Sequence, residues 1–466
     1  MYDVVVIGSG AAGAMAAWRA AELGARTAVL TSAEFGGMTA HDGPVPVRTL
    51  AHAARLMRDA RQRSAYGIAV GEPRLDYSSL LRRVRVVAAQ VADASSRRAD
   101  LDRMGVSIVE HAGLARFVDA HTVVLADGSL FEAATFVVCV GGVPRSLPVP
   151  GGELALTHSA AWAIEQPPGS MIVIGGGATG TQGASVFQAF GTQVELIQVN
   201  GSILPGGDED VSAAVSDGFR RRGIAVQERV DSIDVVEQTH GAMRVTLTID
   251  GVRRTSTADV VLAAIGWAAN VDALGLSSIG VELDGRGFIA VDDYQQTSVP
   301  HVFAAGDVTG AVQLVPEANQ AGYVAATNAV RGPVARRPSS HGPLGSFTDP
   351  EFASVGLTES QARENHDVEV VSIGFDQTTR SIIDGHAEGF CKLVVDRDTR
   401  QVLGCHVVGD RAVDIAQVAY MAMHGGVDVV RLAQMPLSFP TYAGMLARVA
   451  HSAAQSLGVD IATGPR

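Results

Sequence analysis

The sequence predicts an α/β protein with two doubly wound, mainly parallel sheets and a C-terminal domain of the α+β class. Continuous apolar runs bounded by glycine recur along the chain, as expected for strands that are buried on both faces. Alanine-rich segments with helical spacing separate several of these runs. A unit of strand, glycine turn, helix and strand occurs twice, from Tyr2 and from Ser170. Beyond the second unit, strands are followed by helices without another such turn.

Length and composition agree with this fold. A chain of 466 residues is too long for one core, and 52 glycines with only 5% aromatic residues suit many tight βα turns. The formal charge of -13, with dispersed arginines, argues against a nucleic-acid partner. The apolar N-terminus has no cationic leader, and no uncharged apolar run reaches the length of a membrane span. We therefore expect a cytoplasmic protein without membrane insertion.

The first unit carries the turn GSGAAG, which follows a strand and opens a helix. Gly8 permits the tight turn, Gly10 lets the backbone approach a pyrophosphate, and Gly13 lets the helix pack on the strand. The helix N-terminus faces the anion. We therefore expect this turn, including Ala12, to bind a dinucleotide.

The second unit repeats this logic in the turn GGGATG. Gly175, Gly177 and Gly180 occupy the three glycine positions, and Thr179 lies among them. Two such turns in one chain predict a flavin and a nicotinamide nucleotide brought face to face, which makes FAD and NAD(P)H the expected cofactors.

A strand ending in Gly306 and Asp307 forms the third motif, TSVPHVFAAGDVTG. A carboxylate at such a strand end can accept a hydrogen bond from a ribityl hydroxyl, while the following helix approaches the flavin pyrophosphate. The motif therefore indicates a flavin site.

Together these motifs resemble the flavoprotein disulfide reductases, the pyridine nucleotide-disulfide oxidoreductase family that includes dihydrolipoamide dehydrogenase, glutathione reductase and mercuric reductase. The resemblance extends over nearly the whole chain and includes FVVCVGG, which contains Gly141, and AAIGWAAN, which contains Gly266. FTDPEFASVGLTESQAR (Phe347 to Arg363) resembles the dimerisation domain of the family. The resemblance implies a homodimer and adds Gly141 and Gly266 to the expected cofactor-binding residues.

The same resemblance divides the chain into four segments. A stretch rich in Pro, Gly, Ser and Arg at Arg331 to Ser346 indicates a linker ahead of the last segment. The expected boundaries are 1–149 for the first part of the FAD-binding domain, 150–269 for the NAD(P)-binding domain, 270–333 for the return segment of the FAD-binding domain, and 341–466 for the dimerisation domain.

The redox-active loop of the family is altered in this chain. The family segment GGTCxNxGCxPxK aligns with GGMTAHDGPVPVR, in which Gly36 and Gly37 remain as expected flavin contacts. Thr39 and Pro44 stand where the two cysteines should be. The chain has three cysteines, which lie far apart and form no CxxC pair: Cys139, Cys391 and Cys405. Dithiol exchange through this loop is therefore chemically excluded.

The C-terminal acid–base motif of the family is lost as well. Its His-Pro-Thr-x-x-Glu aligns with FPTYAG, so that Phe439 replaces the His and Gly444 replaces the Glu. Tyr442, from the same motif, is expected either to reach the flavin face of the other subunit or to pack at the dimer interface.

Beside the flavin, the Lys–Glu pair of the family aligns with Arg48 and Gln182. The positive charge is kept and the negative charge is lost, so a reduced, anionic flavin is expected to gain stabilisation. The alternative is that Arg48 is an ordinary arginine on a helix surface.

His41 and Asp42 lie between Gly37 and a helix expected to begin near Val47. His41 could protonate a reduced acceptor, because the pKa of histidine is near neutrality. The alternatives are a loop-stabilising role for His41 and a turn or capping role for Asp42.

The carboxylates that usually bind ribose hydroxyls are replaced by neutral side chains. Thr31 ends the second strand of the first unit, and Gln198 ends that of the second unit. Each can bond a hydroxyl without charge. Gln198 has no neighbouring arginine in sequence to bind a 2'-phosphate and no acid to repel one, so the choice between NADH and NADPH stays open.

The residues that remain predict an FAD-dependent NAD(P)H oxidoreductase that passes electrons directly to a small acceptor, such as a quinone-like molecule or another organic electrophile. Two alternatives stay open, namely a flavin oxidase that uses O2 and a non-catalytic flavin-binding redox sensor. No metal site is expected.

Overall fold

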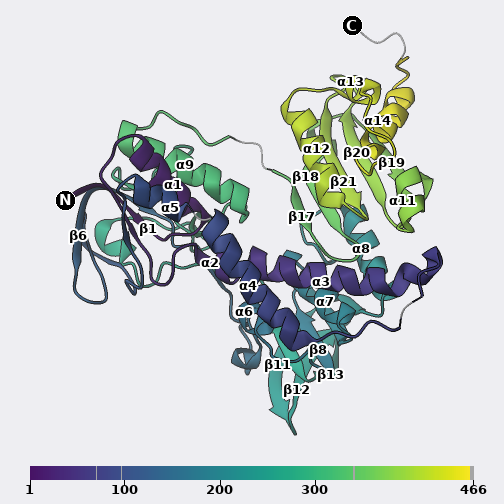
Figure 1. Cartoon of the computed structure of the whole chain (residues 1–466), viewed down its shortest axis with the longest axis horizontal. Coiled ribbons are helices and arrows are strands. Elements are labelled where there is room, and N and C mark those ends of the chain that lie inside the picture. Colours follow the sequence, from purple (N-terminus) through teal and green to yellow (C-terminus); the bar gives the residue numbers. More distant parts are fainter. Residues whose placement is uncertain (70, 96, 339–341, 462–466) are drawn as a thin grey trace. The chain divides into compact units, whose positions relative to one another are not determined.

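The computed structural model describes residues 1–69, 71–95, 97–338 and 342–461. The chain forms two compact units, each of which combines segments far apart in sequence (Figure 1). The first unit contains Met1–Leu50, Asp76–Arg145 and Gly266–Ser339, and the second contains Ala51–Leu75, Ser146–Ile265 and Ser340–Arg466.

The first unit is built on a seven-stranded sheet with the order β3-β2-β1-β6-β5-β4 and with β16 also paired to β6. Strands β3, β2, β1, β6 and β16 pair parallel with one another, whereas β5 pairs antiparallel with both β6 and β4. The strands are β1 (Tyr2–Ile7), β2 (Thr27–Leu30), β3 (Ser107–Val109), β4 (Arg116–Asp119), β5 (Thr122–Val124), β6 (Leu130–Val138) and β16 (Val302–Ala304). A short antiparallel pair, β7 (Gly142–Pro144) and β15 (Trp267–Ala269), completes the unit.

Alanine and glycine let two helices of the first unit pack closely. Helices α1 (Ala11–Glu22) and α9 (Val315–Arg331) lie side by side (Figure 1), and a β-carbon added at Gly322 would lie 2.2 Å from the backbone oxygen of Ala12. The other helices of the unit are α2 (Gly37–His41), α4 (Tyr77–Ser95) and α5 (Arg98–Arg103), with 3-10 turns η3 (Leu276–Ile279) and η4 (Asp307–Thr309). Helix α3 (Pro44–Gln62) begins in the first unit and ends in the second.

The second unit contains a four-stranded parallel sheet, β10-β9-β8-β14, and a three-stranded antiparallel sheet, β11-β12-β13. The parallel strands are β8 (Ser170–Ile174), β9 (Gln193–Val199), β10 (Ala225–Val230) and β14 (Val260–Ala263), and the antiparallel ones are β11 (Ser232–Thr239), β12 (Ala242–Ile249) and β13 (Val252–Ala258). The helices here are α6 (His158–Trp162), α7 (Ala178–Ala189) and α8 (Glu209–Arg221), with the 3-10 turns η1 (Arg63–Tyr66) and η2 (Gly152–Leu154).

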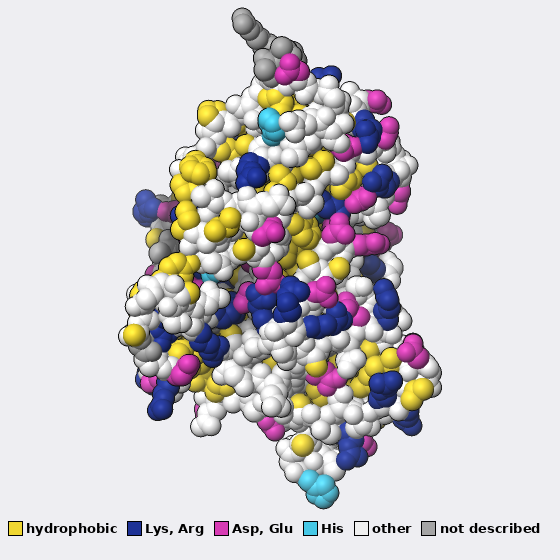
Figure 2. Space-filling model, turned by 90° about the vertical axis from the view of Figure 1, so that its right-hand side faces the viewer, with side chains coloured by type: hydrophobic (Ala, Val, Ile, Leu, Met, Phe, Trp, Pro, Cys, Tyr) yellow, Lys and Arg dark blue, Asp and Glu magenta, His cyan; other side chains and the backbone are white. Residues whose placement is uncertain are grey.

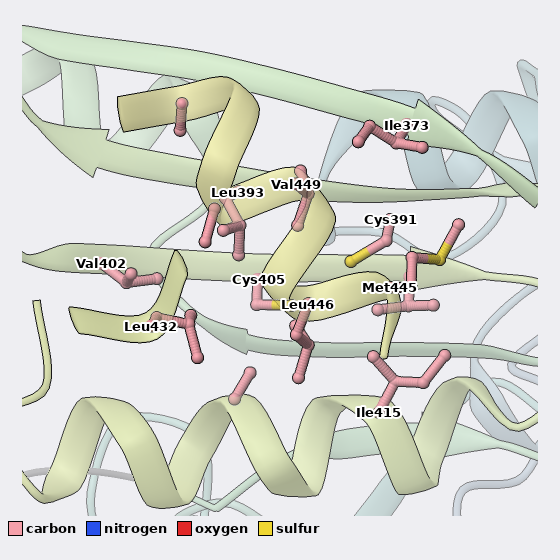
Figure 3. Packing of buried hydrophobic residues seen from close by; sticks show 14 of the residues in the cluster. Ile373, Cys391, Leu393, Val402, Cys405, Ile415, Leu432, Met445, Leu446 and Val449 are labelled. Atoms are coloured by element: carbon pink, nitrogen blue, oxygen red, sulfur yellow. The ribbon is translucent and has the colours of Figure 1, made fainter. Parts of the chain in front are cut away.

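The C-terminal part of the second unit is a five-stranded antiparallel sheet, β17-β18-β21-β20-β19, with helices on it. Its strands are β17 (Leu344–Ser346), β18 (Phe352–Gly356), β19 (Val368–Gly374), β20 (Phe390–Asp396) and β21 (Val402–Val408). Its helices are α10 (Glu359–Asn365), α11 (Thr379–Asp384), α12 (Ala412–His424), α13 (Val429–Gln434) and α14 (Met445–Ser456), with the 3-10 turn η5 (Phe375–Gln377). Figure 3 shows the apolar core between this sheet and its helices.

The predicted fold class is confirmed, since two Rossmann-like units precede an α+β domain. Two local predictions are wrong. The helix expected near Val47 begins at Pro44, because proline has no N–H to lose at a first helical position. The predicted linker ends in strand β17, which is held by antiparallel pairing with β18. Residues 339–341 of that linker lie outside the described residues, and the predicted domain boundaries stay predictions.

No described helix is both long enough and apolar enough to cross a lipid bilayer.

Candidate functional site

The first glycine turn is packed on its inner side and open on its outer side. Gly8 has a φ of 103°, and a β-carbon added there would lie 2.2 Å from the backbone oxygen of Cys139. A β-carbon added at Gly13 would lie 1.9 Å from the oxygen of Gly8, whereas one at Gly10 would meet no atom within 4 Å. Because Gly10 precedes the N-terminus of α1, this open space is where a pyrophosphate can meet free backbone N–H groups. The turn therefore fits the predicted dinucleotide.

The loop that carries the altered redox motif lies directly on this turn. A β-carbon added at Gly37 would lie 2.7 Å from the α-carbon of Gly10, and the N–H of Gly36 donates to the hydroxyl of Ser9 at 3.3 Å. Only glycine fits at Gly37, both for this approach and for its φ of 61°. The residues that follow Gly37 are therefore held next to the first nucleotide turn. The sequence analysis did not single out Ser9, which sits inside the motif without being one of its glycines.

His41 bonds within its own loop. Its Nε2 lies 3.0 Å from the carbonyl oxygen of Phe35, and its Nδ1 lies 3.8 Å from a carboxylate oxygen of Glu34. Asp42 ends helix α2, where its N–H donates to the carbonyl oxygen of Met38. These contacts fit the loop-stabilising and capping alternatives, and the catalytic roles of both residues stay predictions.

Asp307 lies near the first glycine turn, just beyond the carboxyl end of β16. It follows β16, and a β-carbon added at Gly306 would lie 2.9 Å from the β-carbon of Ala12 in α1. Burial raises the pKa of the Asp307 carboxyl. Gly141 follows β6 at this edge, and its carbonyl oxygen accepts from the N–H of Asn270 at 3.2 Å. The strand ends predicted to hold the flavin thus converge on the glycine turn.

Gly266 has a φ of 102° and precedes β15, where its carbonyl oxygen accepts the N–H of Arg145 at 3.0 Å. This contact extends the antiparallel pairing of β15 with β7, the strand that directly follows Gly141. The short β7–β15 ribbon thus connects two of the predicted cofactor-binding glycines within the first unit.

Thr31, the uncharged residue at the end of β2, lies near an acidic residue, Glu110, that the sequence analysis did not identify. Thr31 is buried, and its N–H donates to the carbonyl oxygen of Val109 on the adjacent strand end. Glu110 comes next and accepts the N–H of Phe35 at 2.8 Å while it pairs with Arg98. Although burial opposes the charge, these two donors lower the pKa of Glu110. Its only signal in sequence is an acid directly after a short apolar run.

The second glycine turn has nearly the same geometry as the first. Gly175 has a φ of 107°, and a β-carbon added there would lie 2.3 Å from the oxygen of Ala264. One at Gly180 would lie 1.8 Å from the oxygen of Gly175, and one at Gly177, before α7, would meet nothing within 4 Å. Thr179 lies in the first turn of α7. This turn therefore also fits a pyrophosphate.

Gln198 is tied to this second turn by both ends of its side-chain amide. Its Oε1 accepts the N–H of Gly176 at 2.7 Å, and its Nε2 donates to the carbonyl oxygen of Val199 at 2.7 Å. The side chain is thus fixed against the glycine turn, at the carboxyl end of β9.

Asp208, which lies beyond Gln198 and caps the N-terminus of α8, is anchored by a buried lysine. The Nζ of Lys392 on β20 lies 2.9 Å from Asp208, 2.6 Å from Asp210 and 2.9 Å from Glu359. Burial works against the charge, but the three carboxylates raise the pKa of Lys392. Lys392 and Asp208 are almost fully buried, so each depends on the other for compensation.

Arg48 and Gln182 occupy separate units. Arg48 lies in the first part of α3, and Gln182 is buried in α7 of the second unit. Their predicted roles beside the flavin stay predictions.

Tyr442 is engaged within its own unit. Its hydroxyl donates to a carboxylate oxygen of Asp384 at 3.0 Å, and its ring packs against Phe375 with 6.0 Å between ring centroids. Burial, followed by the nearby Asp410, raises the pKa of Tyr442. Phe439, by contrast, is 81% exposed, which makes it a candidate contact for another molecule.

All three cysteines are buried thiols. Cys139 lies beneath the first glycine turn, and burial raises its pKa to about 12. Cys391 and Cys405 lie on the neighbouring strands β20 and β21, in the core shown in Figure 3. Hydrogen bonding with Cys405, together with burial, raises the pKa of Cys391. The raised pKa values keep the thiols of Cys139 and Cys391 protonated, and a protonated thiol is a poor nucleophile. Among the residues that the structure describes, no cluster of His, Cys, Asp and Glu could hold a metal ion.

Comparison with known proteins agrees with the motifs. Residues 2–322 match the family model "Pyridine nucleotide-disulphide oxidoreductase", and residues 343–450 match the model of its dimerisation domain. The chain is 33% identical over 465 residues to a dihydrolipoyl dehydrogenase of Mycobacterium tuberculosis, covering 97% of each. It is 31% identical over 446 residues to a mercuric reductase of Lysinibacillus sphaericus, covering 95% of this chain and 81% of the relative.

Among solved structures, the HOCl-induced flavoprotein disulfide reductase RclA from Escherichia coli is similar, with a TM-score of 0.85 at 22% identity. The match covers 97% of this chain and 99% of that one. At this identity, the likeness supports the fold.

Proposed function

The chain belongs to the pyridine nucleotide-disulphide oxidoreductase family, and on this premise we propose that it passes electrons from NAD(P)H through FAD to a small acceptor without a disulfide relay. The acceptor is a quinone-like molecule or another organic electrophile. Bound FAD supplies the hydride and electron chemistry, and the protein supplies binding and orientation.

The observation that carries the proposal is the chemistry of the loop on the first glycine turn. Gly37 packs against Gly10, which fixes the loop at the nucleotide. Thr39 and Pro44 stand in this loop where the family has its two cysteines. A hydroxyl and a proline ring cannot form a disulfide or a thiolate. The three cysteines of the chain lie outside this loop and are buried. Burial raises the pKa of Cys139, and hydrogen bonding with Cys405 together with burial raises that of Cys391.

The residues of both turns have binding roles in this proposal. The open spaces outside Gly10 and Gly177 take the pyrophosphates of FAD and NAD(P)H, and the helix N-termini complement their charge. Asp307 holds a polar group of the flavin at the end of β16. The loop at Gly36 and Gly37 then borders the space in which a small acceptor meets the flavin.

We further propose that the chain acts as a homodimer, through the part that matches the dimerisation domain. Several large apolar side chains in that part are more than half exposed, as expected for a surface that another subunit covers. They are Ile382, Ile383, Met421 and Phe439. Sedimentation equilibrium of the purified chain tests this point, and a monomer at micromolar concentration would contradict it.

An anaerobic titration tests the proposed reaction. NADH or NADPH should bleach the long-wavelength absorbance of bound FAD, and a quinone added afterwards should restore it. Lipoamide, glutathione disulfide and dithiobisnitrobenzoate should leave the reduced state unchanged. Turnover of these disulfides at the rates of disulfide reductases would overturn the proposal.

Two further outcomes of the same titration point to the alternatives. Rapid return of the absorbance in air, without an organic acceptor, would favour an oxidase. Bound FAD that neither nucleotide reduces would favour a non-catalytic flavin-binding protein. The variant Thr39→Ala is a matched control, since removal of the hydroxyl should leave reduction by NAD(P)H intact.

A further inference from the structure

The second glycine turn lies at the end of a parallel sheet in which Arg229, on β10, forms no ion pair among the described residues. We propose that this site takes NADPH and that Arg229 binds the 2'-phosphate on the adenosine ribose. The inference rests on the proposed function, because it names which form of the nicotinamide cofactor that function uses.

Arg229 is brought to the site by an irregularity in strand pairing. Strand β10 pairs parallel with β9, with Gln227 opposite Ile197 and then Val230 opposite Val199, so the register shifts across the two residues between them. Arg229 lies in this bulge with a φ of 56°, and its N–H donates to the carbonyl oxygen of Gly201 at 2.9 Å. Bulges and left-handed residues often redirect a side chain at a functional site.

The register also places Arg229 next to Gln198. Val199, the residue after Gln198, is paired with Val230, the residue after Arg229. Neighbouring strands lie about 4.8 Å apart, a distance that an arginine side chain can span. In parallel sheets of this type, the ribose of the adenosine lies at the carboxyl end of the second strand, where Gln198 is.

The guanidinium of Arg229 is exposed and is not used within the protein. Three arginines near the end of α8, Arg220, Arg221 and Arg222, form ion pairs. In the face drawn in Figure 2, basic and acidic side chains are interspersed. Arg220, for example, pairs with Glu228 at 2.7 Å and with Asp217 at 3.3 Å. Within the described ranges, Arg229 makes neither an ion pair nor a side-chain hydrogen bond. Its charge is therefore available to an anion from solution.

The nearest carboxylate does not cancel this charge. Glu228 precedes Arg229, but it accepts hydrogen bonds from the N–H of Ile203 at 2.9 Å, from Ser216 at 2.9 Å and from Arg220. Burial opposes its ionisation, yet these donors lower the pKa of Glu228, so its charge is compensated inside the unit.

Gln198 lacks the charge that would exclude a phosphate. Enzymes that use NADH usually have an acid at this strand end, which binds the 2'-hydroxyl and repels a 2'-phosphate. The amide of Gln198 is neutral, and both of its ends are bonded to the backbone of Gly176 and Val199. Arg229 can reach this position, and Gln198 contributes no negative charge there. Both features favour a dianionic 2'-phosphate over a 2'-hydroxyl on the ribose.

Equilibrium binding of redox-inert fragments tests this inference apart from turnover. Isothermal titration calorimetry of the FAD-loaded protein should show that adenosine 2',5'-bisphosphate binds roughly tenfold or more tightly than adenosine 5'-monophosphate, as expected for a charge-assisted contact. The preference should decrease as salt concentration rises.

Variants of Arg229 assign the preference to this residue. Arg229→Asn removes the charge and suits the left-handed backbone, so it should abolish the preference and leave affinity for the monophosphate unchanged. Arg229→Lys should keep part of it. Arg254→Gln, on the separate antiparallel sheet, is the matched control and should behave as the wild type.

Each contrary outcome has a distinct meaning. Equal affinity for the two fragments, or a preference that survives in Arg229→Asn, would overturn the inference and leave the proposed function standing. Absence of binding by both fragments would overturn the inference and the nucleotide site of the proposed function together.

Discussion

The two glycine turns of this chain share a backbone but differ in what surrounds them. Their first glycines have φ values of 103° and 107°, and their middle glycines have nearly equal backbone angles, -65° and -171° at Gly10 against -74° and -174° at Gly177. In each turn the third glycine packs on the oxygen of the first. The same three contacts thus build a pyrophosphate cradle twice.

The difference lies at the neighbouring strand ends. Thr31 in the first unit has Glu110 beside it, whereas Gln198 in the second unit has Arg229 beside it. The backbone of both turns fits a pyrophosphate. The strand end near the first turn carries Glu110, which is paired with Arg98, and the strand end near the second carries Arg229, which forms no ion pair among the described residues. The backbone of each turn is thus set by residues close in sequence, whereas the charges near it come from residues distant in sequence.

The largest expected effect separates the two cradles. Gly10→Val and Gly177→Val should place a side chain in the proposed pyrophosphate space, and the added β-carbon itself meets no atom within 4 Å at either position. Each should weaken its own nucleotide more than about a hundredfold, because several charge-assisted hydrogen bonds of about 1.5–3 kcal/mol are lost. Gly10→Val should be isolated without FAD. Gly177→Val should retain FAD that NAD(P)H no longer reduces.

The control for this pair is Gly285→Val, whose added β-carbon also meets nothing within 4 Å. Flavin content is measured by absorbance of the purified proteins. Loss of FAD from the Gly177 variant, or its retention in the Gly10 variant, would break the assignment of one cofactor to each turn.

The second prediction concerns the buried ion pair of Lys392 and Asp208, which lies in the second unit. Lys392→Met should lower the free energy of unfolding by about 3–5 kcal/mol, because Asp208 is left buried without its countercharge. Chemical denaturation measures this change. The double variant Lys392→Met with Asp208→Asn should recover much of the loss, and a double variant as unstable as the single one would show that lost packing, not charge, is the cause.

The third prediction tests whether the two glycine turns are equally tightly packed at their third glycine. Gly13→Ala and Gly180→Ala add a β-carbon 1.9 Å and 1.8 Å from a backbone oxygen, so the helix must shift in both. Each variant should lose about 2–3 kcal/mol of stability, as overpacking does. Thermal unfolding of the two variants checks the prediction, with Gly285→Ala as control. A large loss in only one of them would show that the two cradles are not equivalent.

The smallest effect concerns the acid of the first unit. The pKa of Glu110 in the folded protein is below its ordinary value, so its contribution to stability is present above that value and is lost as pH falls through the lowered pKa. Glu110→Gln should reduce stability slightly near pH 7 and flatten its decline in acid. Unfolding midpoints measured across pH 3–7 with and without the substitution test this, and parallel curves would contradict it.

Much of the fold can be predicted from sequence motifs that span only a few residues. Residues five apart, such as Gly8 and Gly13, touch each other in the turn, so the motif alone specifies the contact. The segment from Gln193 to Val199 is one of the apolar runs in the sequence, and it forms strand β9 with the same bounds. Helix α3 begins at Pro44, three residues before the expected start near Val47, because proline is favoured at the first position of a helix.

Side-chain roles were less predictable than the backbone. The sequence placed His41 in the loop by the flavin turn, but only the folded loop shows that its Nε2 lies 3.0 Å from the carbonyl oxygen of Phe35. Tyr442 was predicted from its motif, while its hydrogen bond to Asp384 joins residues 58 apart. Such bonds leave no periodic signal.

The sequence by itself determined the two cradles, the order of the units and the loss of the loop cysteines. Each of these depends on residue types within a few positions of one another. Only the tertiary structure brings the end of β10, which carries Arg229, next to the end of β9, which carries Gln198, and brings Glu110 near Thr31. Strand pairing is made by backbone hydrogen bonds, which are the same for almost every residue, and it therefore leaves no local mark in the sequence.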